Sequence, residues 1–293
     1  MASFTPDGSE TQPDIDQAIT FLKTFDYDGR HHLTAISPYV EGDITAKLFE
    51  PGEWAKMREW VAERIQSHNI YYSANEPKAD APDKKLSKKD IGSIRATWVD
   101  IDPDKGRAFS DERKRLFKIA EGLLYGGLPP SAIIDSGGGI QALWFLRKKL
   151  PGDENATRYE NQNRGIASAI GGDGVSNIDR ILRLPGTLNI PNTAKRAIGR
   201  AKAPARLLTD GKDARRYEFD EIAAKYEPVA PRAFGAKDTA GDLYAQAEAE
   251  IDFRTASACS SPAISNLRHA RNWSGRGATA GACPSCLTER RTA

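Results

Sequence analysis

The chain has 293 residues, 39% of them hydrophobic, and 42 Lys and Arg against 40 Asp and Glu give it a net charge of +2. This length allows about two ordinary domains at most, and the near-neutral charge means that any anion-binding surface must be a local patch. No apolar run approaches the roughly 18 residues of a membrane span, and the polar first twelve residues are unlike a signal peptide, so membrane and secreted classes are excluded.

Apolar residues that recur at helical or strand spacing predict helices and strands that alternate along the chain. In chain order we expect a helix from Asp14, a strand at 33–40, a helix at 53–67, a strand at 70–74, a loop at 75–89, a strand at 95–102, a helix at 111–125, a hairpin of 132–135 and 140–146, a helix at 158–170 and a strand at 181–184. Strands that are interleaved with helices and include a hairpin indicate an α+β mixed sheet rather than a doubly wound parallel sheet.

Composition predicts four segments: a disordered N-terminus at 1–13, a folded domain at 14–227, a linker with a short helix at 228–253, and a low-complexity, disordered tail at 254–293. The abrupt change at residue 254 also fits a truncated chain or a shifted reading frame. All three cysteines lie in this tail, which leaves residues 1–258 without a possible disulfide and favours a cytoplasmic protein. Cys283 and Cys286 have zinc-knuckle spacing that His269 and Cys259 could complete, but a lone C-x-x-C is a weak signal and structural zinc is not expected.

Two aspartates stand at the end of the predicted strand at 95–102, in Trp98-Val99-Asp100-Ile101-Asp102-Pro103. Residues i and i+2 of a strand face the same side, so Asp100 and Asp102 project together while Val99 and Ile101 face the core. Carboxylates this close repel one another unless a cation lies between them, and such oxygen ligands suit Mg²⁺ or Mn²⁺. The pair is a candidate metal site, and the alternative is an acidic strand end exposed to water.

Three successive glycines stand between the two strands of the predicted hairpin. Such a run lets backbone N–H groups approach an anion, and neighbouring polar side chains add donors. No Gly-Lys-Ser/Thr follows, so this is not a Walker loop, and the alternative is a plain hairpin turn. The candidate anion-binding residues are Ser136, Gly137, Gly138, Gly139 and Gln141.

A third polar motif spans 177–189, Asn-Ile-Asp-Arg-Ile-Leu-Arg-Leu-Pro-Gly-Thr-Leu-Asn. Asp179 can supply a further carboxylate. Arg180 and Arg183 are separated by an apolar pair, so at strand spacing they cannot both share the face of Asp179. We expect one to reach a phosphate and the other to support the fold or the carboxylates. A basic run at 195–206 follows, either as solvated surface or as phosphate contacts.

Taken together and in this order, the motifs resemble the archaeo-eukaryotic primase superfamily, specifically the RepB-like primase-polymerase domains of plasmids and phages. The resemblance covers roughly residues 14–208 and implies an RRM-like catalytic core with an N-terminal α/β subunit packed against it. Asp100 and Asp102 match the first metal motif, and Asp179 matches the carboxylate of the third motif, with Asp173 a less favoured candidate. The glycine motif matches the segment that contacts the incoming nucleotide, where many members carry His in place of Gln141.

The resemblance implies a nucleotidyltransferase, a DNA primase or primase-polymerase of a plasmid or phage replicon. Two Mg²⁺ or Mn²⁺ ions on the three motif aspartates would activate a 3′-hydroxyl and neutralise the leaving pyrophosphate. Implied partners are a single-stranded DNA template, NTP or dNTP, and a separate replicative helicase, but no membrane. The implied nucleotide contacts are Ser136, Gly137, Gly138, Gly139, Gln141, Arg180 or Arg183, and Asn189. The candidate DNA contacts are Lys84, Lys85, Lys88 and Lys89, in the loop before the acidic strand, with Lys195 and Arg196.

Two other classes of function remain open. A metal-dependent nuclease or relaxase-type initiator would use a tyrosine and a metal held by a histidine pair. His31 and His32 are adjacent, and Tyr71 and Tyr72 lie in a predicted strand, but neighbouring strand residues point to opposite faces, and we expect the histidines to be surface residues near a turn. A non-catalytic DNA-binding module for replication initiation would keep the fold without the chemistry.

Overall fold

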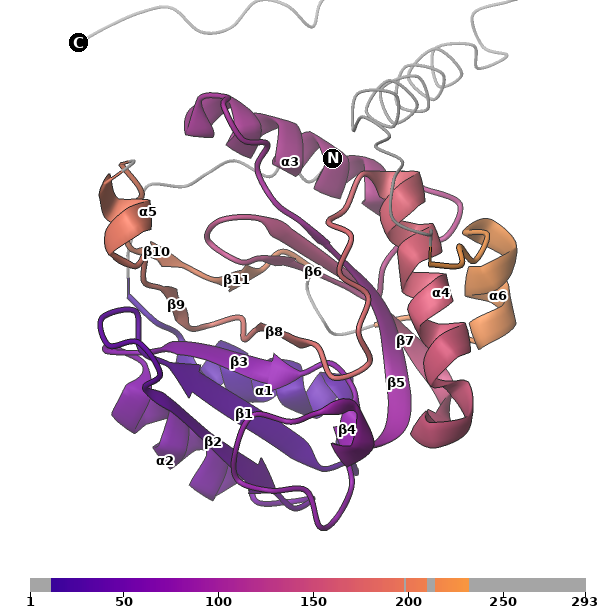
Figure 1. Cartoon of the computed structure of the whole chain (residues 1–293), viewed down its shortest axis with the longest axis horizontal. Helices are drawn as coiled ribbons and strands as arrows, with labels where there is room; N and C mark the ends of the chain where they lie inside the picture. Colours follow the sequence, from indigo (N-terminus) through magenta and orange to yellow (C-terminus); the bar gives the residue numbers. More distant parts are fainter. Residues whose placement is uncertain (1–11, 198, 210–213, 232–293) are drawn as a thin grey trace, which may run out of the picture. The chain divides into compact units, whose positions relative to one another are not determined.

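The computed structural model describes residues 12–197, 199–209 and 214–231, and most strands of this part of the chain belong to two sheets (Figure 1). The first sheet has the order β2 (Ile44–Phe49), β1 (His31–Ile36), β3 (Asn69–Ser73), β8 (Ile181–Arg183). The second has the order β11 (Arg206–Leu207), β6 (Ala132–Asp135), β7 (Ile140–Pro151), β5 (Ile91–Ile101), β4 (Glu76–Pro77). All neighbours in both sheets are antiparallel, while β12 (Arg216–Tyr217) joins β7 in parallel. A separate short ladder pairs β9 (Leu188–Asn189) with β10 (Ala203–Pro204).

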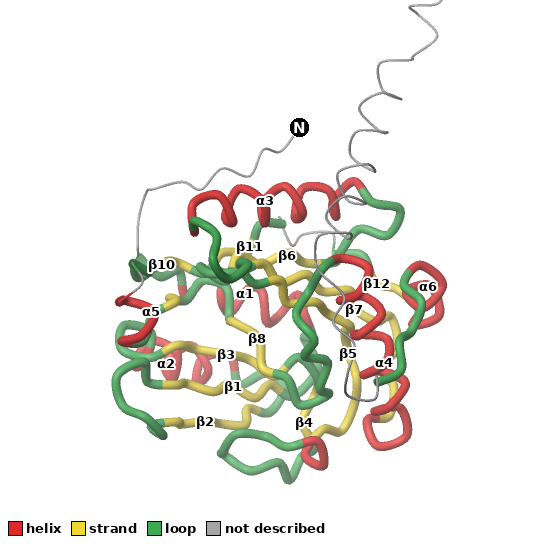
Figure 2. Tube along the Cα trace, turned by 45° about the horizontal axis from the view of Figure 1, so that its top comes forward, coloured by secondary structure: helices red, strands yellow, loops and turns green. Residues whose placement is uncertain are grey.

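All of the helices but the short one at Thr193–Ala197, which has no buried residue, pack through their apolar faces. The helices are α1 (Ile15–Phe25), α2 (Trp54–Arg64), α3 (Phe109–Tyr125), α4 (Gly152–Ile170), α5 (Thr193–Ala197) and α6 (Phe219–Lys225), with a 3₁₀ turn at Lys88–Asp90. α4 packs along β5 and β7, and α3 also contacts β7 (Figures 1 and 2). α1 touches both sheets, because the ring of Phe25 packs on Tyr72 of β3 and on Phe145 of β7.

A buried arginine also connects the two sheets. Arg95 of β5 is 2% exposed and donates to the carboxylate of Asp26 at 3.1 Å and to the carbonyl oxygen of Ser73 in β3 at 2.9 Å. A charge this deep is tolerated only when it is paired and hydrogen-bonded, which these partners provide. The second sheet is therefore held against the first by a polar contact as well as by apolar packing.

The predicted fold class is confirmed: the described chain is a mixed α+β structure with an N-terminal α/β layer packed on a second, larger sheet. The predicted strand at 33–40 is wrong at its end, because β1 stops at Ile36 and the side chain of Ser37 accepts from the backbone of Tyr39 and Val40 in a turn. Strand β2 was not predicted. No helix of the described residues is long and apolar enough to cross a membrane. The predicted tail, its cysteines and most of the predicted linker lie outside the described residues, and the domain limits stay a prediction.

Candidate active site

The two aspartates lie at the end of β5, where the strand leaves the core. Val99 and Ile101 are buried, as the alternation requires, and the side chain of Asp102, just past the end of the strand, is exposed. Asp100 is only 8% exposed, because the first sheet and the segment after α4 cover it. The pair therefore combines one buried carboxyl group with one that meets solvent.

The charges around Asp100 leave an excess of negative charge. Burial, followed by the nearby charge of Asp102, raises the pKa of Asp100 to about 6, although Arg180 opposes the shift. Arg180 Nη2 lies 3.1 Å from Asp100 Oδ2 and 3.7 Å from Asp173 Oδ2. Burial also raises the pKa of Asp173. Two carboxyl groups that share one arginine, with the charge of Asp102 nearby, provide an environment that an added cation would relieve.

The structure places a third aspartate, Asp173, beside Asp100. The Asp173 N–H donates to the carbonyl oxygen of Asp100 at 2.8 Å. Gly172 permits this approach, because a β-carbon at that position would lie 2.2 Å from Val99 Cγ2. The charges that act most on Asp100 include Asp102 and Asp173 and do not include Asp179. Oδ1 of Asp179 is instead buried without a hydrogen-bond partner in the described part of the chain.

The sequence contains a signal for Asp173 that spacing alone does not reveal. Two glycines precede it; Gly171 ends α4 in the left-handed conformation at φ +82°, and Gly172 packs against β5. A glycine pair between a helix and an aspartate indicates a close backbone approach to a neighbouring strand. That signal favours Asp173 over the aspartate inside the Arg-Leu-Pro-Gly motif.

The glycine loop between β6 and β7 lies directly against the acidic pair. A β-carbon at position 139 would lie 2.5 Å from the Ile101 carbonyl oxygen and 2.9 Å from Asp102 Oδ1. The loop also closes on itself: the Ser136 hydroxyl accepts from Gly139 N–H at 2.9 Å, and Asp135 Oδ1 accepts from Gly137 N–H at 2.9 Å. Much of the loop backbone is therefore engaged in a tight turn. The loop belongs to the site because Gly139 lies close to Asp102.

Gln141, Arg183 and Asn189 connect this loop to the first sheet. Gln141 pairs with Asp100 across β7 and β5, and its Oε1 accepts from the Arg183 N–H at 3.2 Å. Arg183 is 7% exposed and donates to Asn69 at 2.7 Å and to the Tyr71 hydroxyl at 2.9 Å. The Asn189 amide donates to the carbonyl oxygen of Ser136 at 2.9 Å. Of the two motif arginines, Arg183 thus supports the fold, while Arg180 is bound to the carboxylates.

Two further arginines lie beside the pair: Arg200, from the predicted basic run at 195–206, and Arg113, which the sequence motifs do not include. Arg200 packs on the ring of Phe109 at 3.7 Å from its centroid, and its nearest charged neighbours are Asp102 and Arg113. Burial lowers the pKa of Arg200, Asp102 raises it, and the like charge of Arg113 lowers it. Arg113 of α3 is ion-paired with Asp135 at the start of the glycine loop. Two cations next to an acidic pair and a side-chain-free loop can bind phosphate oxygens.

The predicted DNA-contacting lysines lie in two places. Lys195 and Arg196 are exposed on α5, near Arg200 in the chain. Lys84, Lys85, Lys88 and Lys89 lie in the segment before β5, where Lys88 is ion-paired with Glu160 at 2.6 Å. Because β5 has eleven residues and a strand rises about 3.3 Å per residue, that segment and the acidic pair stand up to roughly 35 Å apart. Whether these four lysines contact DNA stays a prediction.

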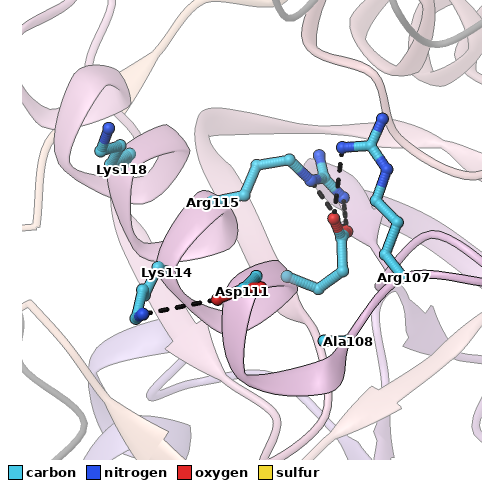
Figure 3. Close-up of a pocket in the computed structure, with 7 residues that line it drawn as sticks. Arg107, Ala108, Asp111, Lys114, Arg115 and Lys118 are labelled. Carbon is cyan, nitrogen blue, oxygen red and sulfur yellow. Dashed lines mark hydrogen bonds and ion pairs between the residues drawn. The ribbon is translucent and has the colours of Figure 1, made fainter.

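A surface pocket lies on the outer side of the start of α3 (Figure 3). Its residues are Arg107, Ala108, Asp111, Glu112, Lys114, Arg115 and Lys118. Glu112 is 2% exposed and accepts from Arg115 at 2.6 Å, and Arg115 also donates to the carbonyl oxygen of Asp102 at 3.4 Å. The pocket therefore places a basic surface next to the end of β5, where Arg115 contacts Asp102.

The histidine pair does not form the metal site of a relaxase. His31 and His32 are 1% and 0% exposed, so their expected place on the surface is wrong. Nε2 of His31 bonds the carbonyl oxygen of Asp26, and Nε2 of His32 bonds that of Pro82, so the rings have separate partners. Burial lowers the pKa of His31 to about 3, which keeps the ring neutral.

Proteins that resemble this chain occur among solved structures. No protein-family model and no curated protein matches the sequence. The primase-polymerase AEP domain of cyanophage S-2L is 18% identical, with a TM-score of 0.47, over 72% of this chain and 97% of that one. The catalytic domain of primase RepB′, solved with initiator DNA, is 14% identical, with a TM-score of 0.44, over 82% and 96%.

The polymerase domain of ligase D from Mycobacterium tuberculosis, solved with DNA, is 13% identical, with a TM-score of 0.37, over 72% of this chain and 86% of that one. These solved structures are primase and polymerase domains. Because one fold can host several activities, the function has to be argued from the side chains of the site.

Proposed function

We propose that the chain is a primase-type nucleotidyltransferase that copies single-stranded DNA from NTP or dNTP. The observation that carries this proposal is the placement of Asp100 and Asp102 against the glycine loop, with Arg200 and Arg113 beside them. Paired carboxylates next to cations and an open backbone suit a reaction in which a cation and a polyphosphate meet. The order of the motifs in the sequence supports the same activity.

The residues at this site fit a divalent cation. Mg²⁺ is usually held by one or two carboxylates, with water and substrate phosphates as the remaining ligands, and Asp100 and Asp102 supply such a pair. The raised pKa of Asp100 is the observation that supports the fit, because a bound cation would stabilise its ionised form. Among the described residues, no three His, Cys, Asp or Glu are arranged to hold a metal ion, so a second ion rests on the resemblance alone.

The chain's own residues would orient the nucleotide. Arg200 and Arg113 would hold the phosphates, and the bare backbone at Gly139 would let them come close to Asp102. Arg180 would keep Asp100 ionised and in place through their ion pair. A bound Mg²⁺ or Mn²⁺ would lower the pKa of the attacking 3′-hydroxyl and offset charge on the leaving pyrophosphate.

We further propose Asp173 as the third carboxylate, in place of Asp179. Its backbone bond to Asp100 and its closeness to Arg180 support this role. Asp173→Asn should lower synthesis about 100-fold or more, as removal of a charge at the reacting centre commonly does. Asp179→Asn should keep most of the activity. If Asp179→Asn lost more activity than Asp173→Asn, Asp179 would be the third carboxylate instead.

The test of the activity is synthesis on primer-free single-stranded DNA with labelled nucleotides and Mg²⁺ or Mn²⁺. The wild type should give products, and Asp100→Asn and Asp102→Asn should give none while still binding DNA. Asp153→Asn is the matched control, because Asp153 is an exposed carboxylate on α4 that pairs with Lys78. Absence of product from the wild type with both metals, with DNA binding retained, would leave the non-catalytic DNA-binding module as the function.

A further inference from the structure

Two exposed aromatic rings near the site are each covered on one side by an arginine. Tyr39, in the turn between β1 and β2, is 58% exposed and lies 5.2 Å from the Arg196 guanidinium. Phe109, at the start of α3, is 36% exposed and lies 3.7 Å from that of Arg200. Each ring therefore combines an exposed aromatic surface with a neighbouring cation.

The two pairs belong to one continuous surface. Arg196 and Arg200 are one turn of chain apart, and Arg200 N–H donates to the Lys195 carbonyl oxygen at 3.0 Å, which closes that turn. The start of α3, then α5, then the turn between β1 and β2 follow one another along one side of the described chain (Figure 1). The Phe109 end lies beside the glycine loop, because a β-carbon at Gly138 would lie 3.6 Å from Arg200 Nη1, and Gly139 of the same loop packs against Asp102.

The composition of this surface is that of a single-strand binding site. Lys195, Arg196 and Arg200 provide positive charge for phosphates, and the two rings provide flat faces for bases. Base stacking on an aromatic side chain stabilises a bound strand by about 1–3 kcal/mol per base and is indifferent to sequence, while the cations follow the backbone. α5 has no buried residue, so its side chains are free to meet a ligand.

We propose that a single DNA strand lies along this surface, with bases stacked on Tyr39 and Phe109 and its phosphates on Lys195 and Arg196, while Arg200 is left for the nucleotide. This inference rests on the proposed function, because the strand would be the template that leads into the acidic pair. The Phe109–Arg200 pair would hold the nucleotide next to the reacting centre, and the Tyr39–Arg196 pair would hold the strand farther out. None of the three motifs includes either ring.

The test is the affinity of the full-length chain for labelled oligothymidylate, measured by fluorescence anisotropy over a range of salt concentrations, without nucleotide or metal. Tyr39→Ala should weaken binding about tenfold with little change in the salt dependence, and Tyr39→Trp should restore it. Arg196→Ala should also weaken binding and should lower the slope of log affinity against log salt by about 1. Phe109→Ala should behave like Tyr39→Ala.

Tyr27→Ala is the matched control, because Tyr27 is 61% exposed but packs on Trp54, next to the end of α1. Equal affinities of the Tyr39→Ala and Tyr27→Ala variants would overturn the proposal. So would a loss confined to Lys114→Ala and Lys118→Ala, which would place the strand on the outer pocket of α3. The assay needs no catalysis, so it separates the two proposals. If the wild type makes no product but Tyr39→Ala still weakens DNA binding, the strand site stands and only the polymerising activity is refuted.

Discussion

Asp100 is the residue at which stability and activity are most clearly opposed. Its folded pKa of about 6 lies above the ordinary value of 3.8, so its ionised form is disfavoured in the fold. As pH rises from about 4 to about 6 the unfolded chain loses this proton first, and the folded chain therefore loses stability over that range. Above about pH 6 the fold bears the full free-energy cost of the buried charge, and below about pH 4 this cost is absent.

Asp100→Asn should therefore be more stable than the wild type at pH 8. We expect a gain on the order of 1–2 kcal/mol in the free energy of unfolding, because the buried charge is removed while an amide oxygen can still accept from Arg180. Urea unfolding at pH 8 and at pH 4 measures it, and the gain should vanish at pH 4. An equal or lower stability at pH 8 would mean that Arg180 fully compensates Asp100.

The same titration should appear in the activity. If ionised Asp100 binds the cation, synthesis should rise about tenfold per pH unit below pH 6 and level off above pH 7. Because metal and proton compete for the carboxylate, the midpoint should move to lower pH as the Mn²⁺ concentration increases. Initial rates from pH 5 to pH 8 at two Mn²⁺ concentrations test this, and a profile without a midpoint would contradict it.

Gly139 contributes to the site because it has no side chain. Gly139→Ala should abolish synthesis and lower stability by about 1–3 kcal/mol, because the new methyl group would meet the backbone of Ile101 and the side chain of Asp102. Gly174→Ala is the control, since a β-carbon there meets nothing within 4 Å. Thermal unfolding and the primer-free assay measure both effects. Normal activity of Gly139→Ala would show that the loop can move away from β5.

Among the elements, β8 is the strand of the first sheet that follows Arg180, and its Arg183 holds it to β3. Arg183→Met should cost roughly 3 kcal/mol of stability, because it leaves the buried Asn69 and the Tyr71 hydroxyl without their shared cation. Urea unfolding tests this, with Arg147→Met, at an exposed arginine of β7, as the comparison. A stable but inactive Arg183→Met variant would instead assign Arg183 to the phosphates.

Elements with long apolar periods could be predicted from the sequence, and those fixed by distant contacts could not. The helix from Asp14 and the hairpin around the glycines have local causes: an N-cap bond to Gln17 N–H and a tight turn. β2 has an exposed, weakly apolar pattern and forms because β1 offers it an edge.

The same distinction applies to the site. The placement of Asp100 and Asp102 follows from strand alternation, which is local. The nearness of Asp173 depends on how the end of α4 packs on β5, and that of Arg200 depends on its contact with Phe109. Neither contact leaves a periodic pattern in the sequence, so spacing could not rank these residues.

At the scale of the whole described chain, the last strand is tied to the first helix. Arg216 of β12 donates to the carbonyl oxygens of Thr24 and Phe25 at the end of α1, both at 2.9 Å, while β12 itself pairs with β7. A chain that ends at residue 209 should therefore fail to fold cooperatively, whereas residues 12–231 should unfold in one transition. Circular dichroism during urea unfolding compares the two, and a cooperative transition of the shorter chain would contradict this.

The tie between Arg216 and α1 also orders events on the ribosome. The nascent chain cannot complete these contacts until residue 216 has left the exit tunnel, although α1 emerges near the beginning of synthesis. At about 5–20 residues per second, the stretch from Phe25 to Arg216 takes roughly 10–40 s to translate. The end of α1 therefore waits for seconds without the strand that later holds it.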